Sequence, residues 1–198
     1  SMHFSATRGM AARYATELPG TTERARLSAA LSAVANNEML ICSTTTESGT
    51  DNLHPLTEAV RTPAGWTVNG KKYFVTMSPV ATHIALNVRA RGELGQDYIA
   101  NVLVPMTQPG ILPQDDWDAL GMRASGSQSI VFENCAVPED AVRFVGPWGQ
   151  WSKPVLLHRT LANVPLVGAF LGIAEAAYEI ALRELGNNVH RSANVGVQ

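Results

Sequence analysis

Residues 39–147 contain a series of short strand patterns with no helical pattern between them. Apolar and polar residues alternate at Ile84–Val88 and again at Tyr98–Val104, where Pro105 ends the run. A further long strand pattern covers Gln128–Val137. Short strands at this spacing pair with their neighbours and form a barrel or a sandwich. The block therefore predicts an antiparallel β-barrel or sandwich domain.

One predicted hairpin lies in the first part of this block. Residues 66–69 alternate in polarity, Asn69-Gly70 is a strong two-residue turn signal, and residues 73–76 alternate again. We expect a turn at Asn69-Gly70. In the second strand, Phe74 and Thr76 would face one side of the sheet, and Tyr73 and Val75 the other.

Helical patterns stand on both sides of the strand block. A pattern at residues 8–18 precedes a second helix, which begins at the hydroxyl cap of Thr21 and ends at Asn36. Residues 151–185 form a third helical pattern, which we expect Pro165 to kink or split. The predicted fold is α+β, with a helical segment at 1–38, a barrel domain at 39–147 and a C-terminal helical segment at 148–198.

Charge and cysteine content limit the classes of function. The formal net charge is −2, which gives no electrostatic case for binding nucleic acid or an anionic membrane. The two cysteines, Cys42 and Cys135, stand far apart in apolar surroundings and predict buried thiols rather than a disulfide or a metal site. No signal sequence and no run long enough to span a bilayer is evident. These features predict a cytoplasmic protein without a bound metal.

The candidate site lies in two segments, Ile41–Asp51 and Asn69–Thr76. The first is rich in serine and threonine, and the second combines a turn signal with aromatic, branched and hydroxyl side chains. Hydroxyls and backbone N–H groups at strand ends can hold a flat hydrogen-bonding ring and its phosphates. Without further information, an ordinary loop beside a core strand explains the same residues.

The order of several motifs resembles the acyl-CoA dehydrogenase superfamily, which has a helical, β-barrel and helical domain order. Its middle domain carries T-E-P-x-x-G-S-D, then G-W-x-(L/I)-N-G-x-K-x-W-I-T-N, then G-x-R-x-S and a later V-P. The resemblance covers roughly residues 39–185 and continues into the start of the family's C-terminal bundle. The matching residues here are Thr46-Glu47, Gly49-Thr50-Asp51, Gly65–Thr76, Gly121–Ser125 and Val137-Pro138.

The resemblance implies an FAD site. Thr46 would meet the edge of the flavin ring, although an alignment without gaps from Gly49 puts Thr44 there instead. Gly49 and Thr50 would approach the pyrophosphate. The remaining implied contacts come from Thr45 through its backbone, Phe74 over the ring face and Thr76 at the reactive N5/O4 edge.

No catalytic residue is assigned by the resemblance. The family's α-proton base lies later in the C-terminal bundle, and the helical glutamates Glu175, Glu179 and Glu184 do not align with it. The N-terminal helical segment is short and the bundle stops early, as expected of a fragment or of ordered pieces of a longer protein.

Three functional hypotheses follow. The first is an FAD-dependent dehydrogenase of fatty acid metabolism that acts on an acyl-CoA thioester, passes hydride to flavin N5 and delivers electrons to an acceptor flavoprotein. The second is a two-component flavin-dependent monooxygenase that needs a flavin reductase. The third is a catalytically incomplete fragment that acts as a binding module. The family also implies a homodimer or homotetramer, to which the small-residue row at Gly168 and Gly172 would contribute.

Overall fold

The computed structural model of the chain describes residues 2–187, 189–190 and 195–196. The chain divides into two compact units, residues 1–158 and residues 159–198. Two helices open the first unit and an eight-stranded sheet follows them. Its elements are α1 (Met2–Thr16), α2 (Thr22–Ala35), β1 (Ile41–Thr44), β2 (Glu58–Thr62), β3 (Gly65–Val75), β4 (His83–Arg91), β5 (Asp97–Pro105), β6 (Ile111–Pro113), β7 (Gln128–Val137) and β8 (Val142–Pro147).

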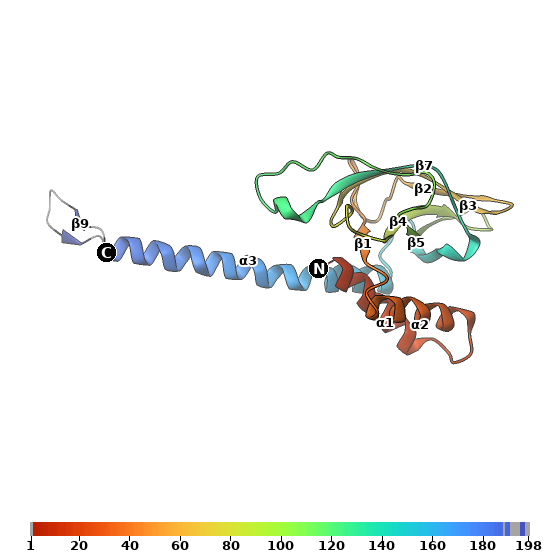
Figure 1. Cartoon of the computed structure of the whole chain (residues 1–198), viewed down its shortest axis with the longest axis horizontal. Helices are drawn as coiled ribbons and strands as arrows, with labels where there is room; N and C mark the ends of the chain where they lie inside the picture. Colours follow the sequence, from red (N-terminus) through yellow and green to blue (C-terminus); the bar gives the residue numbers. More distant parts are fainter. Residues whose placement is uncertain (1, 188, 191–194, 197–198) are drawn as a thin grey trace. The chain divides into compact units, whose positions relative to one another are not determined.

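The two N-terminal helices pack on one face of the sheet next to β1 (Figure 1). As predicted, Thr21 caps α2, because its side chain accepts a hydrogen bond from the backbone N–H of Arg24. The first helix begins earlier and ends earlier than the sequence pattern indicated. Met10 and Leu27 are buried with Ile41 and Ala85 of the sheet in a small apolar cluster.

The sheet corrects the prediction of an antiparallel barrel. Its strand order is β6-β7-β3-β2-β4-β5-β8, and β1 pairs with β4 outside this path. The pairs β1–β4 and β2–β4 are parallel. Parallel pairing needs a long connection, and here at least one other strand, β3, lies between the two paired strands in the chain. The path starts at β6 and stops at β8, so the described strands form a mostly open mixed sheet, and barrel closure is not confirmed.

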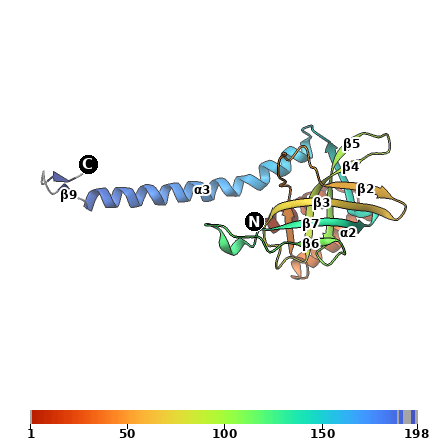
Figure 2. The same cartoon turned by 90° about the horizontal axis from the view of Figure 1, so that it is seen from above.

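The larger of the two apolar clusters among the described residues lies inside the curve of this sheet. It draws side chains from seven strands, among them Cys42 of β1, Ile84 of β4 and Phe132 of β7. Figure 2 shows β2, β3, β7 and β6 side by side. A flat sheet could not bring so many strands to one core, so the sheet bends over on itself. Both cysteines are buried free thiols, as predicted.

The expected hairpin turn at Asn69-Gly70 is wrong, because β3 runs straight through these residues. The strand pairs with β2 up to Asn69 and with β7 on its other side, where the register shifts between Val68 and Gly70. Gly70 has φ +146, and a Cβ there would lie 2.7 Å from the Thr57 Cα. The glycine therefore makes a β-bulge that admits the neighbouring loop, rather than a turn.

The last helix, α3 (Lys153–Asn187), runs through residue 165 as one element, so the expected split at Pro165 is wrong, while the alternative of a kink stays a prediction. It begins in the first unit and provides most of the second, which also contains the antiparallel pair β9 (Val189–His190) and β10 (Val195–Gly196). Apolar residues of α3 such as Phe170 and Ile180 are exposed.

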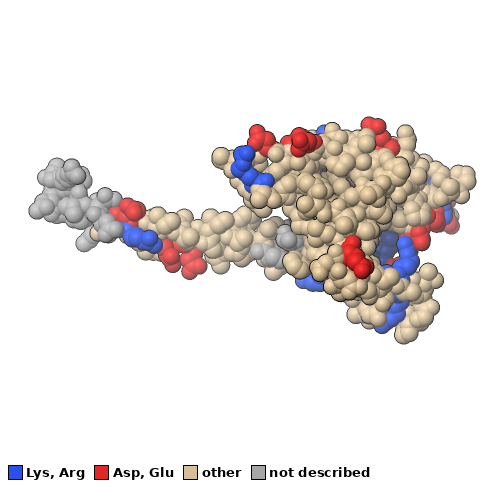
Figure 3. Space-filling model, in the orientation of Figure 1, with Lys and Arg blue, Asp and Glu red and all other residues tan. Residues whose placement is uncertain are grey.

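Charged side chains of both signs mix on the face of the molecule in Figure 3 and do not gather into a patch of one sign. Among the described helices, none is long and apolar enough to cross a membrane.

Candidate functional site

The end of β1 and the end of β3 are joined by hydrogen bonds that position the three consecutive threonines. The Tyr73 N–H donates to the Thr46 carbonyl at 3.0 Å, and the Thr44 hydroxyl donates to the Tyr73 carbonyl at 2.9 Å. Thr44 is buried, Thr45 is half-buried and Thr46 is exposed. In the described part of the chain the Thr46 hydroxyl has no hydrogen-bond partner, and Thr46 is the most exposed of the three, so its hydroxyl can contact a ligand.

Phe74 stands on a second irregularity of β3. The pairing with β7 shifts between Lys72 and Val75, and Phe74 has φ +52. Because of this bulge, Lys72 and Val75 are both buried while the Phe74 side chain is 60% exposed. The simple alternation expected for residues 73–76 therefore breaks down. The Phe74 ring meets the Trp117 ring edge to face, with centroids 6.2 Å apart.

Thr76 belongs to a chain of three hydroxyls. The Thr76 and Ser127 oxygens lie 2.9 Å apart, and the Ser127 and Ser125 oxygens lie 2.7 Å apart. Two more hydrogen bonds join the loop of Ser125 and Ser127 to the β3–β4 turn. The Met77 N–H donates to the Ser125 carbonyl at 2.9 Å, and the Ser78 hydroxyl donates to the Gly126 carbonyl at 3.3 Å. These hydrogen bonds hold the Thr76 segment against the loop of Ser125 and Ser127.

Gly49 and Thr50 lie in a separate turn. The Thr50 hydroxyl donates to the His54 carbonyl at 2.6 Å, and the Asp51 carboxylate accepts from the Leu53 N–H at 2.8 Å and from the His54 N–H at 3.1 Å. Gly49 is exposed at φ +76 with open space around it. Since the Thr50 hydroxyl already donates within the turn, the open backbone at Gly49 is the part that a phosphate could approach.

A buried ion pair fixes the loop between these groups. The Lys72 ammonium contacts the Glu47 carboxylate, and their side chains are 0% and 3% exposed. Glu47 also accepts from the Leu56 N–H at 2.5 Å and the Thr57 N–H at 3.1 Å. Burial by itself would raise the pKa of Glu47, but the Lys72 charge and these hydrogen bonds hold it below its ordinary value. Burial lowers the pKa of Lys72 despite the Glu47 charge.

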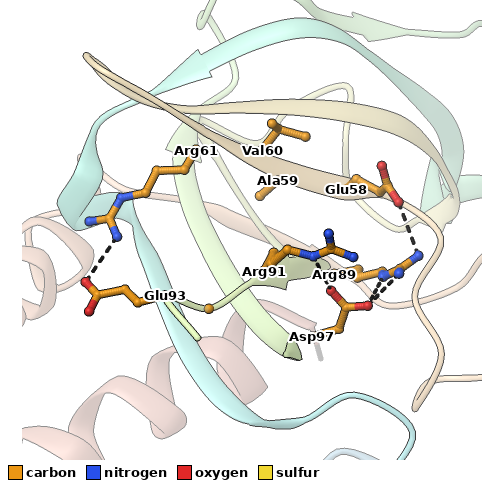
Figure 4. A pocket seen from close by; sticks show the side chains of 9 residues that line it. Glu58, Ala59, Val60, Arg61, Arg89, Arg91, Glu93 and Asp97 are labelled. Carbon is orange, nitrogen blue, oxygen red and sulfur yellow. Dashed lines mark hydrogen bonds and ion pairs between the residues drawn. The ribbon is translucent and has the colours of Figure 1, made fainter. Parts of the chain in front are cut away.

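A groove of about 480 Å³ lies elsewhere on the sheet, against β2, the end of β4 and the start of β5. Figure 4 shows arginines and carboxylates around it that face one another. Arg61 pairs with Glu93, while Arg89 and Arg91 both pair with Asp97. The β2 residues of this groove pair with the first half of β3, whereas Phe74 and Thr76 lie at its other end. The charges of the groove neutralise one another, so the groove is a weaker candidate for a ligand site than the end of β3.

The structure thus brings Thr46, Phe74 and Thr76 to one end of the sheet and places Gly49 and Thr50 in the adjoining loop. Sequence reasoning missed Ser127 and Trp117. Ser125 ends a short 3-10 turn, Gly126 is left-handed and Ser127 precedes β7, so no strand periodicity in the sequence could pair these two hydroxyls. Nothing in the local sequence places Trp117 beside Phe74.

Comparison with known proteins shows which family these strands resemble. Residues 41–135 match the family model "Acyl-CoA dehydrogenase, middle domain". An L-evernosamine nitrososynthase from Micromonospora sp. is 33% identical over 181 residues, which is 91% of this chain and 42% of that protein. The human mitochondrial short-chain specific acyl-CoA dehydrogenase is 27% identical over 63% of this chain and 30% of its own length.

A solved structure of KijD3 in complex with FMN and dTDP-3-amino-2,3,6-trideoxy-4-keto-3-methyl-D-glucose is also similar. It matches with a TM-score of 0.78 and 30% identity, over 94% of this chain and 45% of that one. The chain therefore spans less than half the length of these relatives. The match covers the strands that carry the candidate site, and residues 41–135 belong to the acyl-CoA dehydrogenase middle-domain family.

Proposed function

We propose that this chain supplies the flavin-binding region of a flavin-dependent monooxygenase that oxidises the amino group of a nucleotide-linked sugar. The observation that carries the proposal is the arrangement at the end of β3, where Phe74 is exposed between the Thr46 and Thr76 segments. An exposed aromatic ring beside two hydroxyls suits a flat ring system with polar edges.

The fit to a flavin is specific to these residues. Phe74 would cover part of one ring face, while the Thr46 and Thr76 hydroxyls would bond to the polar edge. The backbone at Thr45 would contribute further contacts, and the Gly49 turn would approach the phosphate end. Bound flavin supplies the redox chemistry, in which its reduced form delivers electrons to molecular oxygen. The protein's contribution is to hold the ring and to polarise its edge.

The choice of substrate rests on similarity. The nitrososynthase is 33% identical to this chain over 91% of its length, against 27% over 63% for the short-chain acyl-CoA dehydrogenase. KijD3 binds FMN and an amino sugar linked to dTDP. An amino sugar nucleotide is therefore better supported than an acyl-CoA.

The first test is the absorption spectrum of the purified protein, before and after addition of FMN or FAD. We expect flavin bands, and the released cofactor identifies which flavin is bound. A colourless protein that takes up neither flavin would contradict the proposal and favour a binding module.

The second test separates the two reactions. With a flavin reductase, NADH and oxygen, a dTDP-linked amino sugar should gain oxygen, as measured by mass spectrometry. Bleaching of the bound flavin by butyryl-CoA without oxygen or a reductase would favour dehydrogenation instead. A control substrate with a hydroxyl in place of the amino group should remain unchanged.

Two kinds of partner follow from the proposal. A separate reductase would supply reduced flavin, as a two-component flavin-dependent monooxygenase requires. Homo-oligomer formation agrees with the exposed apolar residues of α3 such as Phe170 and Leu171. Light scattering after size-exclusion chromatography checks it, and a monodisperse monomer would contradict it.

A further inference from the structure

The hydroxyl chain Ser125–Ser127–Thr76 suggests a role for a residue that does not itself reach the flavin site. Ser127 is buried, with 6% of its surface exposed, and lies between the other two hydroxyls. Its oxygen is 2.9 Å from the Thr76 oxygen and 2.7 Å from the Ser125 oxygen, and in each pair either atom can donate. The backbone bonds of Met77 and the side-chain bond of Ser78 fix the two segments together.

The number of protons on these three hydroxyls decides which hydrogen bond Thr76 can make outward. Three hydroxyls carry three protons, and the two bonds between them use two. If the bonds run from Ser125 through Ser127 to Thr76, the Thr76 proton is free to donate outward. If they run the other way, a Thr76 lone pair faces outward and can accept. Rotation of the three hydroxyls interconverts the two arrangements without breaking any covalent bond.

A flavin needs both arrangements. Its N5 atom accepts a hydrogen bond when the ring is oxidised and carries a proton, and so donates, when the ring is reduced. We propose that Ser127 is a positioning residue that, through Thr76, lets the site bond the flavin edge in both redox states. The proposal rests on the proposed function, because it requires a flavin at Thr76.

The test is a double-mutant cycle read out by flavin affinity. Ser127→Ala should weaken the binding of both oxidised and reduced flavin by about three- to tenfold, as expected for one lost hydrogen bond. Thr76→Val should weaken both at least as much. Because Ser127 acts through Thr76, adding Ser127→Ala to Thr76→Val should change the affinity by less than about twofold.

Spectroscopy supplies a second readout that a loss of packing would not change. The absorption bands of the bound flavin should shift in Ser127→Ala in the same direction as in Thr76→Val. Ser78→Ala is the matched control, because Ser78 bonds the same loop through Gly126 but does not touch Thr76. Its flavin affinity and spectrum should stay near those of the wild type. Ser125→Ala removes the far end of the chain and should give a smaller shift.

Three results would overturn the role of Ser127. The first is unchanged affinity in Ser127→Ala, and the second is an equal loss in the Thr76→Val background. The third is weakening of one redox state alone, which would mean that the chain has a fixed direction. A wild-type protein that binds no flavin would instead overturn the proposed function, and the role of Ser127 with it. Circular dichroism of each variant confirms that it folds.

Discussion

Lys72 of β3 and Glu47 of the loop after β1 form an ion pair that is closed off from solvent. The pair links the strand that carries Phe74 and Thr76 to the loop that carries Thr46 and Gly49. Glu47 reaches further, to the backbone N–H groups of Leu56 and Thr57, where the loop joins β2. One carboxylate therefore fixes both ends of the loop that borders the candidate site.

Removal of one partner should destabilise the fold strongly. Lys72→Met leaves the Glu47 charge buried and uncompensated, and we expect it to lower the free energy of unfolding by about 3–5 kcal/mol. The double variant Lys72→Met with Glu47→Gln should recover much of this loss, because glutamine can still accept from a backbone N–H. Urea unfolding measures the two single variants, Lys72→Met and Glu47→Gln, and the double variant. Destabilisations that simply add would contradict the coupling.

The Lys72–Glu47 pair should make the stability of the fold depend on pH in the acid range. The pKa of Glu47 is below its ordinary value, since the Lys72 charge and hydrogen bonds outweigh the effect of burial. A carboxyl with a lowered pKa contributes stability that is complete above its unfolded pKa of about 4.3 and is lost as the pH falls toward the folded value. The stability difference between the wild type and Glu47→Gln should therefore narrow between about pH 5 and pH 3.

Urea midpoints at several pH values check this prediction. The control is Glu93→Gln, which removes an exposed carboxylate that pairs with Arg61. It should change the free energy of unfolding by less than about 1 kcal/mol at every pH tested. A wild-type advantage over Glu47→Gln that is as large at pH 3 as at pH 7 would contradict the assignment.

Gly70 should tolerate no side chain. Its φ of +146 is a conformation for glycine, and a Cβ would lie 2.7 Å from the Thr57 Cα. Gly70→Ala therefore combines backbone strain with a clash, and we expect a loss of about 3 kcal/mol or more. Gly95→Ala is the control: φ is +85, but nothing lies within 4 Å. It should cost about 1 kcal/mol, and equal losses in the two variants would rule out the clash.

Phe74 should matter for flavin binding and little for folding. Its side chain is 60% exposed, so Phe74→Ala should lower the unfolding free energy by less than about 1 kcal/mol. The buried Phe132 is the contrast, where Phe132→Ala should cost about 3–5 kcal/mol. Phe74→Ala should nevertheless weaken flavin binding, measured by fluorescence titration. Unchanged flavin affinity would remove Phe74 from the site.

Both thiols should resist modification in the folded protein. Burial raises the pKa of Cys42 to about 12, and burial also raises the pKa of Cys135. Little thiolate is then present near pH 8, and the thiolate is the reactive form. Ellman's reagent should detect two thiols per chain in urea and almost none in native buffer. Fast reaction of one thiol in native buffer would contradict this.

Much of the local structure could be predicted from the sequence. The cap at Thr21, the strand at Gln128–Val137 and the burial of both cysteines follow from patterns within a few residues, where periodicity and side-chain chemistry act directly. The family resemblance also depends on short motifs whose order the chain preserves.

The errors come from contacts between distant segments. Asn69-Gly70 has the local chemistry of a turn, but pairing with β2 on one side and β7 on the other holds it in a strand. Alternation around Phe74 fails because the shifted pairing between β3 and β7 turns its side chain outward. Barrel closure likewise depends on whether the edge strands meet, which no local pattern specifies.

Patterns in the sequence predict the α+β class, the positions of most helices and strands and the threonine-rich segments of the candidate site. Packing between segments decided how accessible each threonine is, because the Thr44 hydroxyl is bonded to the Tyr73 carbonyl while Thr46 is exposed. It also decided that Ser127 supports Thr76 and that Lys72 meets Glu47. These pairs lie far apart in the chain, and only the curved sheet brings them within hydrogen-bonding distance.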